Sequence, residues 1–331
     1  MKEVIDLIKK ERRKPIRMLK LEALLRRLPA GHPARGKIEE ELAGRMAGYK
    51  GEQAIDYYLR LLPSDRYLIF HGLRLPGMND TYFQMDTLMV TSRFMVILEV
   101  KNMKGTLFFD EEAKQMIRTF DDVKEAYPHP MVQATIQKSQ LQSWLHRHKL
   151  PRLPITAFVV ISQPSTILQT SPEHKSIFRK MFHAASLPEK INGIDHSYQT
   201  DLLNPKELRQ TVRLLLKEDS LENPDVLQQF QIDSSDILPG IQCPDCSMLL
   251  MTRKRGSWHC PHCQSTSKQA HIPALVDYAL LLKSTITNQQ MREFLGFSSM
   301  STATKLLSSL KLPHTGTFSN RTYSLLDLIN C

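Results

Sequence analysis

Two apolar segments separated by a short turn constrain this 331-residue chain more than any other feature. Residues 82–90 and 94–102 read as β-strands, and the turn between them sets a hairpin register that pairs Asp86 with Glu99. Lys101 is predicted to lie beside Glu99, because side chains on one face of a strand recur at every second residue. The sequence therefore predicts that two carboxylates and one ammonium group share a site.

Facing carboxylates destabilise a sheet unless a cation or a shared proton compensates them. A divalent metal is the simplest compensation, and two carboxylates with retained waters suit Mg²⁺ or Mn²⁺. Such a metal polarises a phosphoryl oxygen and lowers the pKa of bound water, while Lys101 would orient the nucleophile or stabilise charge on phosphate. The alternative is that Glu99 and Lys101 are solvated charges on an exposed face and that Asp86 is a polar residue near a strand end.

Three short motifs and a glycine follow one another in the chain: Gly51-Glu52-Gln53-Ala54, Gln84-Met85-Asp86, Ile97-Leu98-Glu99-Val100-Lys101-Asn102 and Gly105. In order and spacing they resemble the nuclease-related domain (NERD), a branch of the PD-(D/E)xK nuclease superfamily, over about residues 49–185. The resemblance implies a mixed sheet flanked by helices and metal-dependent cleavage of phosphodiester bonds. One departure is Arg93, at a turn position that often holds glycine in the family.

The resemblance also implies roles for individual residues. Asp86 and Glu99 would bind the metal, and Lys101 would be the catalytic lysine. Glu52 would assist from the first helix of the domain, and Gln133 would match the glutamine of a later helix. From the residues alone, Glu52 is equally well a glutamate favoured by the dipole of a helix N-terminus, and Gln133 a surface glutamine.

Positive charge is concentrated near the start of the chain. The net charge is +10, and residues 1–50 alone hold 14 Lys or Arg against 7 Asp or Glu. A basic patch there would attract a polyanion, with an affinity that falls as salt rises; a solvated helical arm is the alternative. The sequence has no signal-peptide core and no run of ~20 apolar residues, so we expect a soluble, cytoplasmic protein without membrane contact.

Changes of pattern along the chain predict five segments. They are a basic helical arm (1–48), a nuclease-related catalytic domain (49–217), a linker (218–239), a zinc ribbon (240–271) and a winged-helix-like domain (272–331). The expected elements are helices at 3–28 and 37–47, a strand pair at 105–109 and 115–120, a helix from Gln133, a buried strand at 155–162 and a helix at 202–217. The fold class is thus α/β with two small additional domains.

Four of the five cysteines form two C-x-x-C pairs, Cys243 with Cys246 and Cys260 with Cys263. Tetrahedral Zn²⁺ needs four ligands, and four thiolates leave no position open for a substrate. The spacing therefore predicts a structural zinc site that stabilises a small ribbon. Redox-active or incidental thiols are the alternative.

Basic and aromatic residues lie between the two cysteine pairs: Arg253, Lys254, Arg255 and Trp258. This composition suits phosphate contact and base stacking. An exposed loop tip with Trp258 as its small core fits equally well.

The last sixty residues follow a pattern of three helices and a hairpin that resembles a winged-helix module. Thr287 opens a capping box, Gly296 would end that helix, and Ser298 or Ser301 would cap the next one. A wing is expected around Thr315-Gly316 or Ser319-Asn320. The candidate recognition helix carries Thr302 and Lys305 but few cations, so protein contact or subunit pairing is the alternative to nucleic-acid binding.

Together these features predict a metal-dependent nuclease that is placed on its substrate by a zinc ribbon and a winged helix. We expect Mg²⁺ or Mn²⁺ as catalytic metal, Zn²⁺ as structural metal, and DNA rather than RNA as partner. The first alternative is a non-catalytic nucleic-acid-binding regulator or scaffold with a nuclease-like fold. The second is a protein-interaction adaptor, which would show no salt-sensitive DNA affinity.

Overall fold

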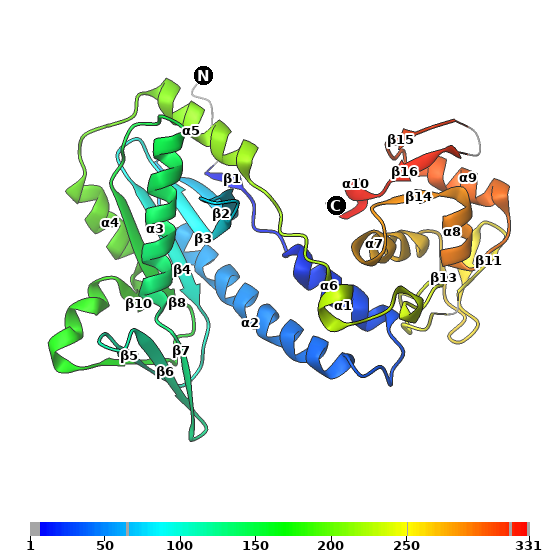
Figure 1. Ribbon diagram of the computed structural model, residues 1–331, viewed down its shortest axis with the longest axis horizontal. Coiled ribbons are helices and arrows are strands. Elements are labelled where there is room, and N and C mark those ends of the chain that lie inside the picture. Colours follow the sequence, from blue (N-terminus) through cyan, green and yellow to red (C-terminus); the bar gives the residue numbers. More distant parts are fainter. Residues whose placement is uncertain (1–6, 64–65, 250, 318–319, 330–331) are drawn as a thin grey trace. The chain divides into compact units, whose positions relative to one another are not determined.

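The computed structural model describes residues 7–63, 66–249, 251–317 and 320–329 (Figure 1). The chain divides into two units. Unit 1 comprises Met1–Lys14 with Gly44–Glu222, and unit 2 comprises Pro15–Ala43 with Asn223–Cys331. Both units mix helices with strands, so the predicted α/β class is confirmed. The predicted division into five segments stays a prediction.

Unit 1 is built on a six-stranded mixed sheet of order β1-β2-β3-β4-β8-β10. Its strands are β1 (Ile8–Lys10), β2 (Leu68–Pro76), β3 (Tyr82–Val90), β4 (Met95–Lys101), β8 (Ile155–Ile161) and β10 (Met181–His183). The β2–β3 and β3–β4 pairs are antiparallel, and the other neighbours are parallel. Strand β8 is almost entirely buried between β4 and β10, as its continuous apolar sequence predicted.

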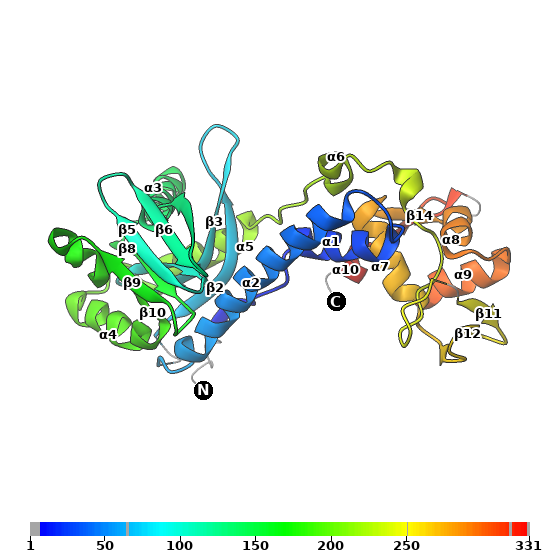
Figure 2. The same cartoon turned by 90° about the horizontal axis from the view of Figure 1, so that it is seen from below.

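Helices flank both faces of this sheet, which confirms the predicted architecture. They are α2 (Arg35–Leu59), α3 (Pro130–Arg147), α4 (Leu187–Ser197) and α5 (Pro205–Glu218), with short 3-10 turns at Pro172–Arg179 and Ala184–Ser186. Leu141 and Trp144 of α3 pack in one core, whereas Ile55 of α2 and Ile191 of α4 pack in the core on the opposite face. Figure 2 shows the β2–β3 hairpin extending away from the remaining strands.

A second sheet, of order β7-β6-β5-β9, extends unit 1. Its strands are β5 (Thr106–Asp110), β6 (Gln115–Phe120), β7 (Val123–Pro128) and β9 (Ile167–Thr170). The predicted β5–β6 pair is present, while β7 and β9 were not predicted. Gly105 precedes β5 with φ of +98°, and a Cβ there would lie 2.3 Å from the Thr119 carbonyl oxygen, so this position requires glycine.

The predicted N-terminal helices are wrong in extent. Residues 8–10 form strand β1 beside β2, and helix α1 (Ile16–Arg27) begins only after Pro15. Helix α2 runs without interruption to Leu59 instead of ending at residue 47. Residues 3–6 of the first predicted helix lie outside the described residues. Strand pairing at the sheet edge outweighs the helical pattern of residues 8–10, because local propensity is a weak preference.

Many cations of the basic N-terminal segment are used in ion pairs within each unit. In unit 1, Lys10 pairs with Asp219 at 2.7 Å. In unit 2, Arg26 and Arg27 pair with Asp277 at 2.6 and 2.8 Å, and the Arg27 and Asp277 side chains are only 1% and 3% exposed. These three cations are therefore part of the packed structure, while Arg13, Lys37 and Lys50 are exposed. A basic patch in this segment stays a prediction.

Unit 2 contains two three-stranded sheets. The first has the order β11-β12-β13 and the second β14-β16-β15. The strands are β11 (Thr252–Lys254), β12 (Ser257–His259), β13 (Thr266–Ser267), β14 (Thr285–Thr287), β15 (His314–Thr315) and β16 (Thr322–Ser324). The remaining helices are α6 (Val226–Phe230), α7 (His271–Leu281), α8 (Asn288–Leu295), α9 (Met300–Ser309) and α10 (Leu326–Ile329), with a 3-10 turn at Ser234–Asp236.

The order α7-β14-α8-α9-β15-β16 contains the three helices and the hairpin expected of the last sixty residues, whereas β14 and α10 were not predicted. The winged-helix-like assignment stays a prediction. Thr287 forms the predicted capping box with Gln290, and Gly296 ends α8 with φ of +75°. Ser299, rather than Ser298 or Ser301, caps α9. The β15–β16 hairpin spans Gly316, and Ser319 of the other proposed turn lies outside the described residues.

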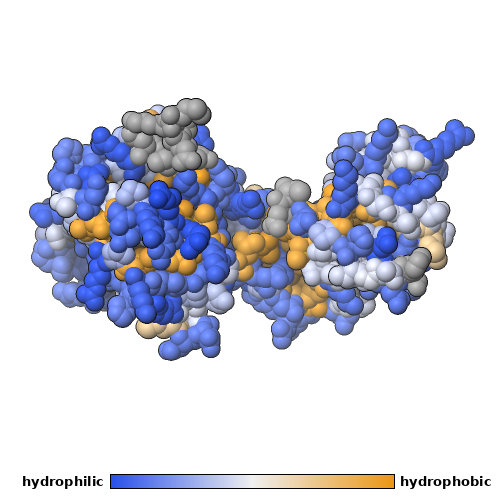
Figure 3. Space-filling model, turned by 90° about the horizontal axis from the view of Figure 1, so that it is seen from above, coloured by the Kyte–Doolittle hydropathy of each residue, from blue (hydrophilic) through white to orange (hydrophobic). Residues whose placement is uncertain are grey.

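The visible surface of both units is largely hydrophilic, with apolar residues in smaller areas (Figure 3). Among the residues that the structure describes, no helix combines the length and apolar character needed to cross a bilayer.

The close approach of α2 to the sheet depends on Gly51. A Cβ at this position would lie 2.3 Å from Asn102 Cβ and 2.8 Å from Ser162 Oγ. We expect Gly51→Ala to lower the free energy of unfolding by about 1–3 kcal/mol in chemical denaturation, because α2 must shift. Gly48→Ala is the matched control, since an added Cβ there meets nothing within 4 Å; helix propensity should raise its stability by up to ~1 kcal/mol. Equal losses in both variants would contradict this role of Gly51.

Candidate functional site

Strands β3 and β4 separate at the candidate site. Thr87 pairs with Leu98 and Val90 with Met95, which confirms the register predicted from the turn. The ladder ends there, one pair short of Asp86 and Glu99, so the direct pairing of these two residues was wrong. Beyond this point β3 stays paired with β2, and β4 stays paired with β8. The two strand pairs therefore form a fork with Asp86 at its base.

A distortion in β2 lies opposite Asp86. The β2–β3 ladder passes from the His71–Thr87 pair to the Leu73–Met85 pair and omits Gly72, whose φ is +58°. Phe70 and Leu73 lie in the same core although they are an odd number of residues apart, so the alternation of faces changes here. Asp86 consequently turns toward β4, where its Oδ2 accepts a hydrogen bond from Val100 N at 2.8 Å.

Glu99 and Lys101 lie beside each other at the end of β4, as predicted. Lys101 Nζ donates to Glu99 Oε1 at 2.7 Å and to Gln133 Oε1 at 3.0 Å. Gln137 Nε2 donates to Glu99 Oε2 at 2.8 Å. Glu99 is 2% exposed, so the alternative of a solvated carboxylate on an open face is wrong. Of the two glutamines, Gln133 was predicted and Gln137 was missed, although it is the polar member of the buried stripe of α3.

Burial and like charge act on Asp86. Burial raises the pKa of Asp86 well above its usual range, and the neighbouring Glu99 and Glu52 carboxylates raise it further. The Val100 hydrogen bond and Lys101 oppose this shift only in part. The ionised form of Asp86 is therefore costly unless a further cation approaches it.

Glu52 reaches the site from α2, but Arg12 holds it. Arg12 Nη1 donates to Glu52 Oε2 at 2.6 Å, and the Arg12 side chain is 6% exposed. Burial raises the pKa of Glu52, while the charge of Arg12 and its hydrogen bond lower it. The same guanidinium contacts Asp56, His71 and Thr87. Glu52 was predicted as a site residue, whereas its partner Arg12 and the further contacts of Arg12 were not.

His71 is neutral at this site. Its Nδ1 lies 2.8 Å from Arg12 Nη2, and since a guanidinium only donates, Nδ1 must accept. Burial lowers the pKa of His71 to about 4, and Arg12 lowers it as well. His71 thus adds no charge to the site.

Asp86 and Glu99 fit a hard dication. Both supply carboxylate oxygens, and in the described part of the chain Asp86 Oδ1 has no hydrogen-bond partner. Apart from the four cysteines discussed next, no three Asp, Glu, His or Cys side chains among the described residues bring ligand atoms within 4.8 Å of one another. The protein would therefore supply two carboxylates, and waters would complete the coordination that Mg²⁺ prefers.

The four predicted zinc ligands converge in unit 2. The sulfurs of Cys243, Cys246, Cys260 and Cys263 lie within 4.8 Å of one another, and two of the Sγ–Sγ distances are 3.5 Å. Sulfurs bound to a tetrahedral zinc at about 2.3 Å lie ~3.8 Å apart, whereas a disulfide needs about 2 Å. The residues after the two pairs, Ser247 and Gln264, both have φ of +62° and donate to the Cys243 and Cys260 carbonyl oxygens. The two C-x-x-C turns therefore have the same geometry, and together they fit one structural zinc.

Trp258 lies inside the ribbon. It is 1% exposed, its Nε1 donates to His271 Nδ1 at 3.2 Å, and its ring packs edge-on against Phe297. The structure thus favours a core role for Trp258 over base stacking. The guanidinium of Arg253 lies over the same ring at 4.9 Å, while Lys254 and Arg255 are exposed. On α9, Lys305 is exposed and Thr302 is half-buried.

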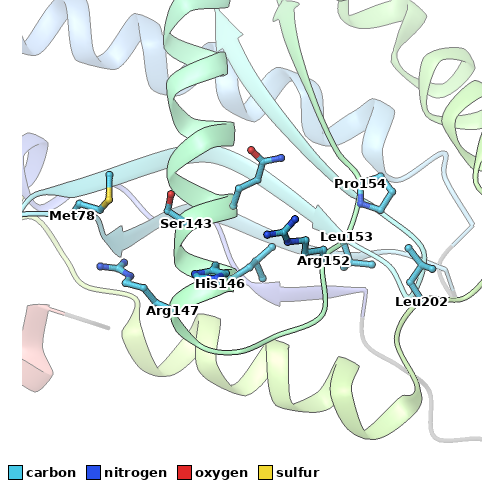
Figure 4. Close-up of a pocket in the computed structure, with 10 residues that line it drawn as sticks. Met78, Ser143, His146, Arg147, Arg152, Leu153, Pro154 and Leu202 are labelled. Atoms are coloured by element: carbon cyan, nitrogen blue, oxygen red, sulfur yellow. The ribbon is translucent and has the colours of Figure 1, made fainter.

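Unit 1 has a hollow of about 820 Å³ near the C-terminal end of α3 (Figure 4). It is lined by the C-terminal turns of α3, including His146 and Arg147, and by Arg152 and Leu153 of the following loop. About 20 Å of helix separates His146 from Gln133. Arg147 donates to the Pro76 and Gly77 carbonyl oxygens and so links α3 to the β2–β3 hairpin.

Comparison with known protein families places the acidic site in context. Residues 47–162 match the nuclease-related domain. The match includes Glu52, Asp86, Glu99, Lys101 and Gln133, and it makes a nuclease-related function the best-supported one for unit 1. It does not include Arg12 or the cysteine cluster. No curated protein and no solved structure is significantly similar to the chain.

The raised pKa of Asp86 predicts a gain of stability on neutralisation. When no Mg²⁺ or Mn²⁺ is added, ionised Asp86 destabilises the folded state increasingly as pH rises from the unfolded pKa toward the higher folded pKa. We expect Asp86→Asn to raise the midpoint of thermal unfolding, more at pH 8 than at pH 4. An Asn carbonyl still accepts from Val100 N, which isolates the effect of charge. A decrease in the midpoint at pH 8 would contradict this account of Asp86.

Proposed function

We propose that unit 1 is a metal-dependent nuclease that hydrolyses phosphodiester bonds, with DNA as the preferred substrate. The observation that carries the proposal is the approach of Asp86 and Glu99 at the fork between β3 and β4, with Lys101 beside them. The match of this segment to the nuclease-related domain supports the reaction class.

Each residue has a distinct role in this proposal. Asp86 and Glu99 hold Mg²⁺ or Mn²⁺, which when bound supplies polarisation of the phosphoryl oxygen and acidification of water. Lys101 stabilises the negative charge that develops on the phosphate, and Gln133 and Glu99 fix the position of its ammonium group. Gln137 orients Glu99, and Glu52 assists from α2.

The alternative is a non-catalytic nucleic-acid-binding regulator or scaffold. It differs from the nuclease in one measurable respect, since nucleic acid would be bound and remain intact in the presence of a divalent metal. The placement of Asp86 beside two further carboxylates, which raise its pKa, favours the nuclease, because a scaffold has no need of this costly arrangement.

Purified protein should cleave DNA when Mg²⁺ or Mn²⁺ is supplied. We expect Lys101→Met and Asp86→Asn to lower the cleavage rate about 10²–10³-fold or more, as expected for loss of a group that stabilises transition-state charge. Gel assays with single-stranded and double-stranded DNA and RNA would measure both activity and substrate class.

Lys124→Met is the matched control, because Lys124 is an exposed lysine of β7 in the same unit. It should cleave like the wild type. Equal rates in all four proteins would indicate a contaminating nuclease, and intact nucleic acid bound by the wild type would favour the scaffold.

Unit 2 is proposed to place the enzyme on nucleic acid. Lys254 and Arg255 of the β11–β12 hairpin are exposed cations, and Thr302 and Lys305 of α9 occupy the candidate recognition helix. Arg253 supports this hairpin through its stacking on Trp258. Phosphate contacts from such side chains supply affinity without sequence information.

We expect Lys254→Glu to weaken DNA binding and to reduce the slope of log affinity against log salt by about one, the amount for one lost phosphate contact. Lys283→Glu, an equal change of charge after α7, should leave the slope unchanged. Fluorescence anisotropy in buffer without added Mg²⁺ or Mn²⁺ measures binding without cleavage and leaves the structural zinc in place. Unchanged slopes in both variants would show that this hairpin does not contact nucleic acid.

A further inference from the structure

Arg12 belongs to the candidate site although it lies far outside the segment that matches the nuclease-related domain. Strand β1 pairs with β2 at the sheet edge and brings the following residues next to His71. The Arg12 side chain is as buried as a core residue, at 6% exposed. A buried cation at this position needs an explanation in terms of charge.

Several contacts anchor the guanidinium of Arg12, and one further contact joins it to Glu52. The two carboxylate oxygens of Asp56 accept hydrogen bonds from Arg12 Nε at 3.2 Å and from Arg12 Nη2 at 2.9 Å. Nη2 also lies 2.8 Å from His71 Nδ1 and 3.2 Å from Thr87 Oγ1. These contacts fix the plane of the guanidinium and leave Nη1 directed at Glu52, 2.6 Å away. Glu52 Oε2 is therefore already occupied by a positive group.

The charges of the site balance when one dication is added. The carboxylates are Glu52, Asp56, Asp86 and Glu99, and the cations are Arg12 and Lys101. His71 is neutral, and the nearby Lys10 is paired with Asp219. If all four carboxylates are ionised, four negative and two positive charges leave two negative charges in excess. A single dication compensates this excess. Without Arg12, one negative charge would remain.

We propose that Arg12 is a built-in counter-ion that takes the place of a second metal, so that this site binds one dication only. The inference rests on the proposed metal site at Asp86 and Glu99. Arg12 is a positioning residue in this account, because it acts on Glu52 and touches neither metal nor substrate. The nuclease-related segment alone would lack this charge.

Titration with Mn²⁺ tests the inference without reference to cleavage. Zinc-loaded, full-length protein is titrated with Mn²⁺, and bound ions are counted by calorimetry and by the EPR signal of free Mn²⁺. We expect one Mn²⁺ per chain in the wild type and two in Arg12→Met, where Glu52 and Asp56 become free to bind. Adding Glu52→Gln to Arg12→Met should return the count to one.

Arg17→Met is the matched control, because Arg17 is also a buried arginine paired with a glutamate, Glu41, but in unit 2. Its count should stay at one. Equal counts in the wild type and Arg12→Met, or two ions in the wild type, would overturn the inference. No ion in the wild type and one in Arg12→Met would instead support the counter-ion and reject the proposed catalytic metal site.

A measurement on the wild type serves if Arg12→Met does not fold. The Nε–H NMR signal of Arg12 should persist when Mg²⁺ is added in excess, because the guanidinium stays paired with Asp56. Loss of this signal on addition of Mg²⁺ would show that metal displaces Arg12, and would overturn the inference.

Discussion

The candidate site depends on the hydrogen bond between the Asp86 carboxylate and Val100 N. In a continuous β3–β4 ladder a backbone carbonyl would satisfy this amide, and Asp86 would stand on one face of a closed sheet. At the fork the amide needs another partner, because buried backbone donors are rarely left unsatisfied. Asp86 supplies it, and Gly72 supplies the left-handed conformation that lets β2 follow β3 away from β4. Strand geometry and the position of the carboxylate therefore determine each other.

The cost of gathering carboxylates at the fork explains why distant segments meet there. Lys101 is local, since it follows Glu99 on the same strand face. Arg12 is remote and reaches the site only because β1 adds to the edge of the sheet beside β2. Helix α2 contributes Glu52 at the place where Gly51 allows close contact with the end of the sheet. The segment that matches the nuclease-related domain thus contains the acids and one cation, while the second cation comes from outside it.

The sequence predicted what depends on local spacing. The hairpin register, the Glu99–Lys101 contact and the four-cysteine cluster all follow from short intervals along the chain. The fork between β3 and β4 could not be predicted in this way, because it depends on Gly72 in a different strand. The alternation of side chains along β3 and β4 carries no sign of it. Arg12 gave no signal either, since one arginine in a basic segment resembles its neighbours. Gln137 had a weak signal, as a glutamine among apolar residues on the buried side of α3.

The buried Asp277 and the half-buried Asp86 differ in how their charge is compensated. Asp277 receives hydrogen bonds from both Arg26 and Arg27, so its charge is compensated inside the protein and fastens α1 to α7. Asp86 has one backbone donor, and its nearest charged neighbours include two further carboxylates that raise its pKa. A protein retains an uncompensated charge of this kind at a stability cost only where a ligand repays it. The contrast with Asp277 therefore supports the proposal that Asp86 binds a cation.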